Sequence, residues 1–111
     1  MKYEIIWSKD SGDELAEIIS YIKYTGGKIT AEKIYLKIIN EVKRASENSG
    51  GRRIAPLLKE FGIHYIHQLN ISPWILFYKA ADKKIEIISI IDGKRNSEEI
   101  LYKKIMDGKI I

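Results

Sequence analysis

Two adjacent cations, Lys94 and Arg95, follow a nearly continuous apolar run from Ile87 to Ile91. A run of this kind is typical of a buried strand, which would give the pair a rigid support. Ammonium and guanidinium groups bind phosphate and carboxylate oxygens, and the planar arginine fork can do so through two parallel hydrogen bonds. The sequence therefore predicts an anion-binding site at Lys94 and Arg95, with a solvated polar turn as the alternative.

The only histidines, His64 and His67, are the side chains suited to proton transfer near neutral pH. Three residues apart on a strand, they would point to opposite faces, so we expect no shared metal ion. His67 alternates with Leu69 and Ile71, which favours a place on the core side. It is then either a hydrogen-bonded structural residue or a chemical group, and both interpretations stay open.

Further candidates are two arginines and two aromatic residues. Arg52 and Arg53 follow a Gly-Gly turn, and their position predicts a target or antitoxin contact, a solvated loop, or a salt bridge to the last helix. Trp74 and Tyr78 are expected on the same face of one strand. Aromatic rings in that arrangement can stack on nucleobases, but core packing or contact with a protein partner is the favoured hypothesis.

Hydrophobic periodicity predicts the elements that must position these residues. Ser11 and Glu14 match a capping box at the start of a first helix, and Thr30 is expected to cap a second. The predicted order is a strand near residues 2–8, a helix ending at Gly26-Gly27, a helix to about residue 48, a helical turn over Pro56–Phe61, strands over Ile63–Ile71, Trp74–Ala80 and Ile85–Ile91, and a helix over Glu98–Met106 capped by Asn96 or Ser97.

This order, β-α-α-β-β-β-α, indicates an α+β fold. Short links between the last three strands imply an antiparallel meander, and the short Gly-containing link between the helices implies a helical hairpin. The hairpin must bury its apolar stripe, and one face of an antiparallel sheet is the available surface. We expect one domain over residues 1–111.

The composition limits the possible partners. The net charge is +4, and residues 52–111 carry 11 Lys and Arg against 7 Asp and Glu, which favours an acidic partner such as nucleic acid or protein. The absence of cysteine excludes disulfides and thiolate metal sites. Without a signal-like segment or a long apolar run, the sequence predicts a soluble, cytoplasmic protein with no membrane contact.

Over Tyr3 to Tyr102 the chain resembles the RelE/ParE superfamily of type II toxin–antitoxin toxins. The resemblance lies in "DELAEIISYI", "GRRIAP", "IHQLNISPWILFYK" and "IISIIDGKRN", in this order, and the G-R-x-x-P segment favours the ParE branch. It implies a toxin that a neighbouring antitoxin neutralises. ParE-like members are associated with poisoning DNA gyrase, and RelE-like members cleave mRNA in the ribosome.

The chain departs from the family pattern at three positions. Ile75 stands in place of an arginine of the hairpin strand, His67 in place of a leading arginine, and Asp92 where relatives often carry histidine. Since isoleucine cannot bind phosphate and aspartate repels it, these departures favour binding over RNA cleavage. We therefore expect a ParE-like toxin that needs no cofactor or metal. The residues expected to contact the target are Arg52, Arg53, Lys94 and Arg95. Trp74 and Tyr78 are expected to contact the antitoxin or to form an aromatic face.

Two alternatives remain. The first is a ribosome-dependent mRNA interferase, a metal-independent endoribonuclease that would use Arg95 with His67 or Tyr102. The second is an inactive relative that acts as a binding module. The chain is expected to form a homodimer or a hetero-oligomer with its antitoxin.

Overall fold

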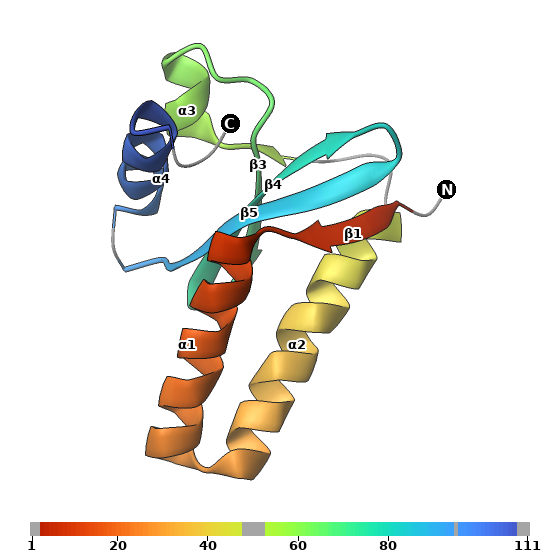
Figure 1. Ribbon diagram of the computed structural model, residues 1–111, viewed down its shortest axis with the longest axis vertical. Coiled ribbons are helices and arrows are strands. Elements are labelled where there is room, and N and C mark those ends of the chain that lie inside the picture. The colour runs from red at the N-terminus through yellow and green to blue at the C-terminus, as the bar shows by residue number, and fades with distance from the viewer. Residues whose placement is uncertain (1–2, 48–52, 95, 109–111) are drawn as a thin grey trace.

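The computed structural model describes residues 3–47, 53–94 and 96–108, and shows a sheet with a long helical hairpin on one side and two short helices on the other (Figure 1). The predicted order is confirmed. A two-residue strand is added before the predicted helical turn. The elements are β1 (Glu4–Trp7), α1 (Lys9–Gly26), α2 (Lys28–Glu47), β2 (Arg53–Ile54), α3 (Pro56–Glu60), β3 (His67–Ile71), β4 (Trp74–Ala81), β5 (Lys84–Asp92) and α4 (Ser97–Met106).

The sheet has the strand order β1-β5-β4-β3-β2. β3, β4 and β5 form the predicted antiparallel meander, and β2 extends it antiparallel to β3. The sheet is not antiparallel throughout, because β1 pairs in parallel with β5. Parallel neighbours need a long crossover connection, and here the whole chain between β1 and β5 supplies it. Sequence periodicity carries no signal for a pairing over such a separation.

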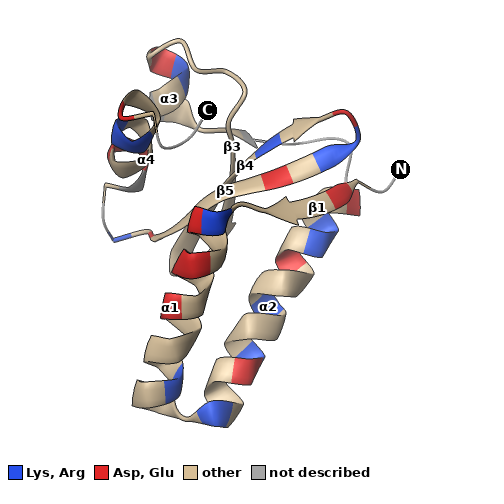
Figure 2. Cartoon of the chain, in the orientation of Figure 1, with Lys and Arg blue, Asp and Glu red and all other residues tan. Residues whose placement is uncertain are grey.

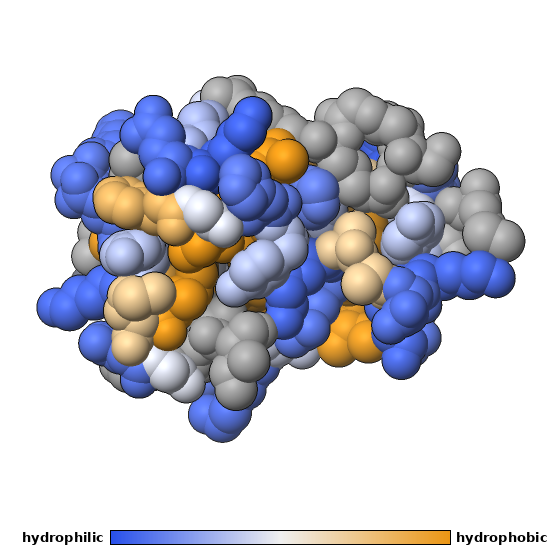
Figure 3. All heavy atoms as spheres, turned by 90° about the horizontal axis from the view of Figure 1, so that it is seen from above, coloured by the Kyte–Doolittle hydropathy of each residue, from blue (hydrophilic) through white to orange (hydrophobic). Residues whose placement is uncertain are grey.

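Both faces of the sheet are buried, where the sequence predicted a cover on one face only. On the hairpin side, Leu15, Ile38 and Val42 pack against Leu76, Ile87 and further strand residues. On the other side, α3 and α4 bury a second core of Ala55, Leu58, Ile63, Ile66, Phe77, Ile88, Ile91 and Leu101. A strand covered on both faces is apolar at nearly every position, which accounts for the run in β5. From above, polar side chains surround several apolar patches (Figure 3).

The second predicted strand, which is β3 in the structure, is shorter than expected. It begins at His67 instead of Ile63, because the segment before it packs under α3 and α4. Ile63 and Ile66 are buried there, and their backbone groups bond to Leu58 and Ala55 instead of to a neighbouring strand.

The predicted caps of the two long helices are wrong. Ser8 caps α1: its Oγ accepts a hydrogen bond from the Ser11 N–H at 3.1 Å. Ser11 is buried, and its hydroxyl donates to the Ile87 carbonyl oxygen at 2.9 Å, which anchors α1 to β5. α2 already begins at Lys28, so Thr30 lies inside the helix. The stop at Gly26-Gly27 is confirmed, since α1 ends at Gly26 and Gly27 has a φ of 91°.

The turn between β4 and β5 places two residues other than glycine, Asp82 and Lys83, in the left-handed region, with φ of 52° and 61°. A side chain is unfavourable there, and glycine is the preferred residue at such turn positions. We expect Lys83→Gly to raise the free energy of unfolding by about 0.5–1 kcal/mol in urea titrations. Lys84→Gly, one residue into the strand, is the control and should lower it by a similar amount. Equal effects of the two changes would contradict the prediction.

Candidate functional site

The basic turn after β5 is fixed by two contacts. Asp92 Oδ1 accepts a hydrogen bond from the Lys94 N–H at 2.9 Å, and the Gly93 N–H donates to the Pro73 carbonyl oxygen at 2.7 Å. The turn is thereby held against the link between β3 and β4. The side chain of Lys94 is exposed, and Arg95 lies outside the described residues. The structure thus gives the expected cationic turn a rigid base.

Glycine is required at position 93 because of this close approach. A Cβ there would lie 2.8 Å from the Pro73 oxygen, a backbone atom that cannot rotate away. We expect Gly93→Ala to lower the free energy of unfolding by about 1–3 kcal/mol, the usual range for overpacking. Gly12→Ala is a matched control inside α1, where a Cβ meets nothing within 4 Å, and it should stabilise by up to about 1 kcal/mol. Thermal unfolding of both variants would show opposite signs.

A polar hollow of about 560 Å³ lies beside the basic turn. The Nε2 of Gln68 donates to the Asn70 Oδ1 at 2.9 Å, and the buried Gln68 Oε1 accepts no hydrogen bond from the described residues. Two amides and one lysine can bind a carboxylate, a phosphate or a peptide group. Sequence reasoning missed both amides, although their alternation on β3 was a signal. The hollow is lined by Gln68, Asn70, Ser72, Pro73, Trp74, Ile75, Gly93 and Lys94.

The interferase hypothesis needs either His67 or Tyr102 beside Arg95, and the structure places these two alternatives on opposite faces of the sheet. His67 stacks on Tyr78, with ring centroids 5.3 Å apart, on the hairpin side of the sheet. Tyr102 packs on Phe61 at 4.6 Å, on the α3–α4 side. The sheet separates the two side chains, so they cannot act together on one phosphate. Arg95 lies outside the described residues.

The remaining predicted residues divide between core and surface. Tyr78 is 3% exposed and belongs to the core, so it cannot contact a partner or a base. Trp74 lies on the same face, as expected, but is only half-buried. Arg53 lies in β2 opposite Gln68, and Arg52 falls outside the described residues. Among the residues that the structure describes, no three histidine or acidic side chains gather into a metal site.

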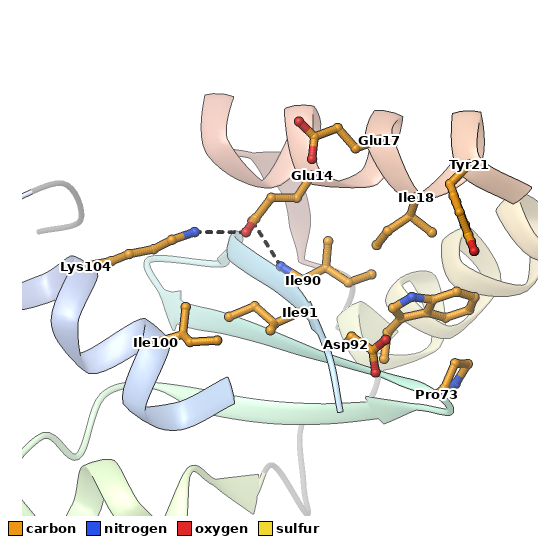
Figure 4. Close-up of a pocket in the computed structure, with 11 residues that line it drawn as sticks. Glu14, Glu17, Ile18, Tyr21, Pro73, Ile90, Ile91, Asp92, Ile100 and Lys104 are labelled. Atoms are coloured by element: carbon orange, nitrogen blue, oxygen red, sulfur yellow. Dashed lines mark hydrogen bonds and ion pairs between the residues drawn. The ribbon is translucent and has the colours of Figure 1, made fainter. Parts of the chain in front are cut away.

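A groove of about 550 Å³ lies between α1 and α4, over the end of β5 (Figure 4). Apolar side chains from α1, β4, β5 and α4 form its floor, and carboxylates from α1 and β5 stand along it. Trp74 lines both this groove and the polar hollow, so the two depressions meet at the start of β4. The lining residues are Glu14, Glu17, Ile18, Tyr21, Pro73, Trp74, Ile90, Ile91, Asp92, Ile100 and Lys104.

Glu14 joins three elements at one end of this groove. β1 ends at Trp7, and beyond it the start of α1 covers the edge of β5. The Glu14 carboxylate accepts hydrogen bonds from the Ser89 hydroxyl at 2.9 and 3.1 Å and from the Ile90 N–H at 3.3 Å. It also pairs with Lys104 of α4 at 2.8 Å. Sequence reasoning had assigned Glu14 to a capping box, and the structure shows instead that it ties α1 and α4 to β5.

The far end of the hairpin has a different character. Tyr24 is 90% exposed and Ile29 is 71% exposed. Between the two helices lies a mainly apolar hollow of about 490 Å³, lined by Ile19, Lys23, Lys28, Ala31, Glu32, Tyr35 and Leu36. The acidic residues of α1 lie in the half of that helix nearest the sheet, whereas the residues at the turn of the hairpin include lysines (Figure 2). Helix α1 therefore carries its acidic residues near the sheet and a lysine, Lys23, near the turn of the hairpin.

No described helix is long and apolar enough to cross a membrane.

Comparison with known proteins identifies a matching family and a similar solved structure. The family model "ParE toxin of type II toxin-antitoxin system, parDE" matches residues 5–97. Among solved structures, the chain is similar to the "Chromosomal ParDE TA system from P. aeruginosa", with a TM-score of 0.66 and 19% identity over 82% of this chain and 96% of the other. No curated protein matches. The structural likeness supports the fold, and the family match covers most of the chain. The chain therefore belongs to the ParE toxin family of type II toxin–antitoxin systems.

Proposed function

We propose that the chain is the toxin of a type II toxin–antitoxin pair and that it arrests growth by binding a cellular target, with DNA gyrase as the target. The observation that carries this proposal is the family match over residues 5–97, and the likeness to the solved ParDE structure supports the same fold. Lys94 and Arg95, with Arg52 and Arg53, are proposed to contact the target. The polar hollow beside Lys94 supplies further hydrogen-bonding groups.

Binding is favoured over RNA cleavage by the chemistry around the basic turn. Cleavage needs a group that activates the ribose hydroxyl and a group that protonates the leaving oxygen. The described residues that line the polar hollow provide amides, a hydroxyl, a lysine and the apolar Ile75. His67 and Tyr102 lie on opposite faces of the sheet. These positions support a surface that holds a partner.

The proposal includes an antitoxin that docks in the groove between α1 and α4 and forms a hetero-oligomer with the toxin. The groove exposes apolar floor residues in a protein that is otherwise rich in charge. An apolar surface of this kind is a common mark of a protein-binding site. The antitoxin encoded beside this chain is the expected occupant.

Expression without the antitoxin is the test of toxicity. Growth should stop, and co-expression of the neighbouring gene product should restore it. We expect Arg95→Ala to remove toxicity while antitoxin binding and thermal stability stay unchanged, because one lost hydrogen-bonded charge weakens a complex by about 10- to 100-fold. Lys103→Ala, an exposed cation of α4, is the control and should remain toxic.

The target is tested with purified components. On the gyrase proposal, the chain inhibits DNA supercoiling and leaves translation intact. Ribosome-dependent mRNA cleavage would instead establish the interferase alternative. Normal growth at a high level of soluble protein would identify an inactive relative that only binds.

A further inference from the structure

The groove between α1 and α4 combines an apolar floor with an acidic rim. Trp74 and Ile100 are half-buried, so each offers apolar surface to an incoming side chain. Glu17 and Asp92 are exposed and stand along the same groove (Figure 4). An occupant must therefore match an apolar surface and a negative charge at the same time.

The charges of the groove do not cancel. Among the described residues that line the groove, Lys104 is the only lysine, and it is paired with Glu14 at 2.8 Å. Glu17 and Asp92 have no cation within ion-pair distance among the described residues, and Asp92 only accepts a backbone hydrogen bond. The groove thus carries two uncompensated carboxylates, although the net charge of the chain is +4.

We propose, on the basis of the function proposed above, that the antitoxin fills this groove with a segment that is basic and apolar. Apolar side chains of this segment pack on Trp74 and on Ile100, and its Lys or Arg side chains pair with Glu17 on α1 and with Asp92 at the end of β5 (Figure 4). The overall charge of the toxin would predict an acidic antitoxin segment. Local complementarity at an interface, however, decides register and association rate.

The same charges disfavour a second copy of the chain as the occupant. A twofold contact between two copies would bring the same patch of each together. Four uncompensated carboxylates would then face one another, and like charges in close contact are unfavourable. An acidic partner segment would instead suit the hollow between α1 and α2. Lys23 and Lys28 line that hollow together with a single acidic residue, Glu32.

The test measures binding of the purified antitoxin, the product of the reading frame beside this one, to toxin variants by calorimetry. Glu17→Lys reverses one rim charge. Asp92→Asn removes the other and keeps the oxygen that accepts from the Lys94 N–H. We expect the double variant to bind at least tenfold more weakly, with a smaller dependence on salt. Glu32→Lys is the control, a charge reversal in the hairpin hollow, and should bind as the unchanged toxin does.

Three outcomes would overturn the inference. If the double variant binds the antitoxin with unchanged affinity, the two rim carboxylates do not contribute to antitoxin binding. Tighter binding of Glu32→Lys shows that an acidic segment docks at the hairpin hollow instead. A dimer of the toxin alone that Glu17→Lys dissociates, seen by light scattering, shows that the groove binds a second copy. Because binding is measured on purified proteins, a chain that proves non-toxic refutes the proposed function and leaves this test intact.

Discussion

Phe77→Ala is expected to lower the free energy of unfolding by about 3–5 kcal/mol, the range for a large buried side chain cut to alanine. Phe77 is fully buried and lies in β4, in the core that α3 and α4 cover. The change leaves a cavity between the sheet and α4 that the rigid strand cannot close. Since the total free energy of unfolding of a domain of this kind is about 5–15 kcal/mol, the variant should be largely or partly unfolded at 37 °C.

Phe61→Ala is the matched control, because these are the only two phenylalanines of the chain. Phe61 is 54% exposed and contacts the ring of Tyr102. Its loss should lower the free energy of unfolding by about 1 kcal/mol, the value of an aromatic pair. Urea titrations of both variants measure the difference. Similar values for the two would mean that α3 and α4 do not cover the sheet as described.

Glu14→Ala is the second large effect that we expect, at about 2–3 kcal/mol of lost stability. The change leaves the Ser89 hydroxyl and the Ile90 N–H without their acceptor and leaves Lys104 without its partner. Buried groups left in this state destabilise a fold by about 1–3 kcal/mol each, and the partial exposure of this site limits the total for these three groups to about 2–3 kcal/mol.

Glu17→Ala, one turn further along α1, provides the control. Glu17 is exposed and forms no hydrogen bond or ion pair with another described residue, so its removal should change stability by less than about 0.5 kcal/mol. Hydrogen exchange adds a local measure, since Glu14→Ala should expose the Ile90 amide while Glu17→Ala should not. Equal protection of that amide in both variants would refute the role given to Glu14.

Elements that depend on nearby residues were predictable from the sequence. The meander of β3, β4 and β5 follows from short links, and the helical hairpin follows from two apolar stripes joined at Gly26-Gly27. The basic turn at Lys94 was likewise visible, because a polar sequence interrupts an apolar run. Each of these signals lies within a few residues along the chain.

Features that depend on distant residues were not predictable in the same way. A capping box at Ser11 and Glu14 is a sound local pattern, but Ser11 bonds to Ile87 and Glu14 to Ser89 across the fold. Both side chains therefore bind partners more than seventy positions away instead of capping the helix. Similarly, the acidic groove arises only where α1, β5 and α4 meet. Its negative charge could not be predicted from a sequence whose net charge is positive.

The parallel pairing of β1 with β5 has a consequence for the order of events during synthesis. Glu4 is in register with Lys84, so β1 can pair with β5 only after about eighty further residues have been synthesised. At about 5–20 residues per second, that interval lasts roughly 4–16 s. The helical hairpin can form during this time from local contacts alone. The sheet closes only when the last quarter of the chain emerges, and the basic turn becomes rigid at the same moment. A chain cut short before β5 therefore lacks the strand that completes the sheet and the basic turn.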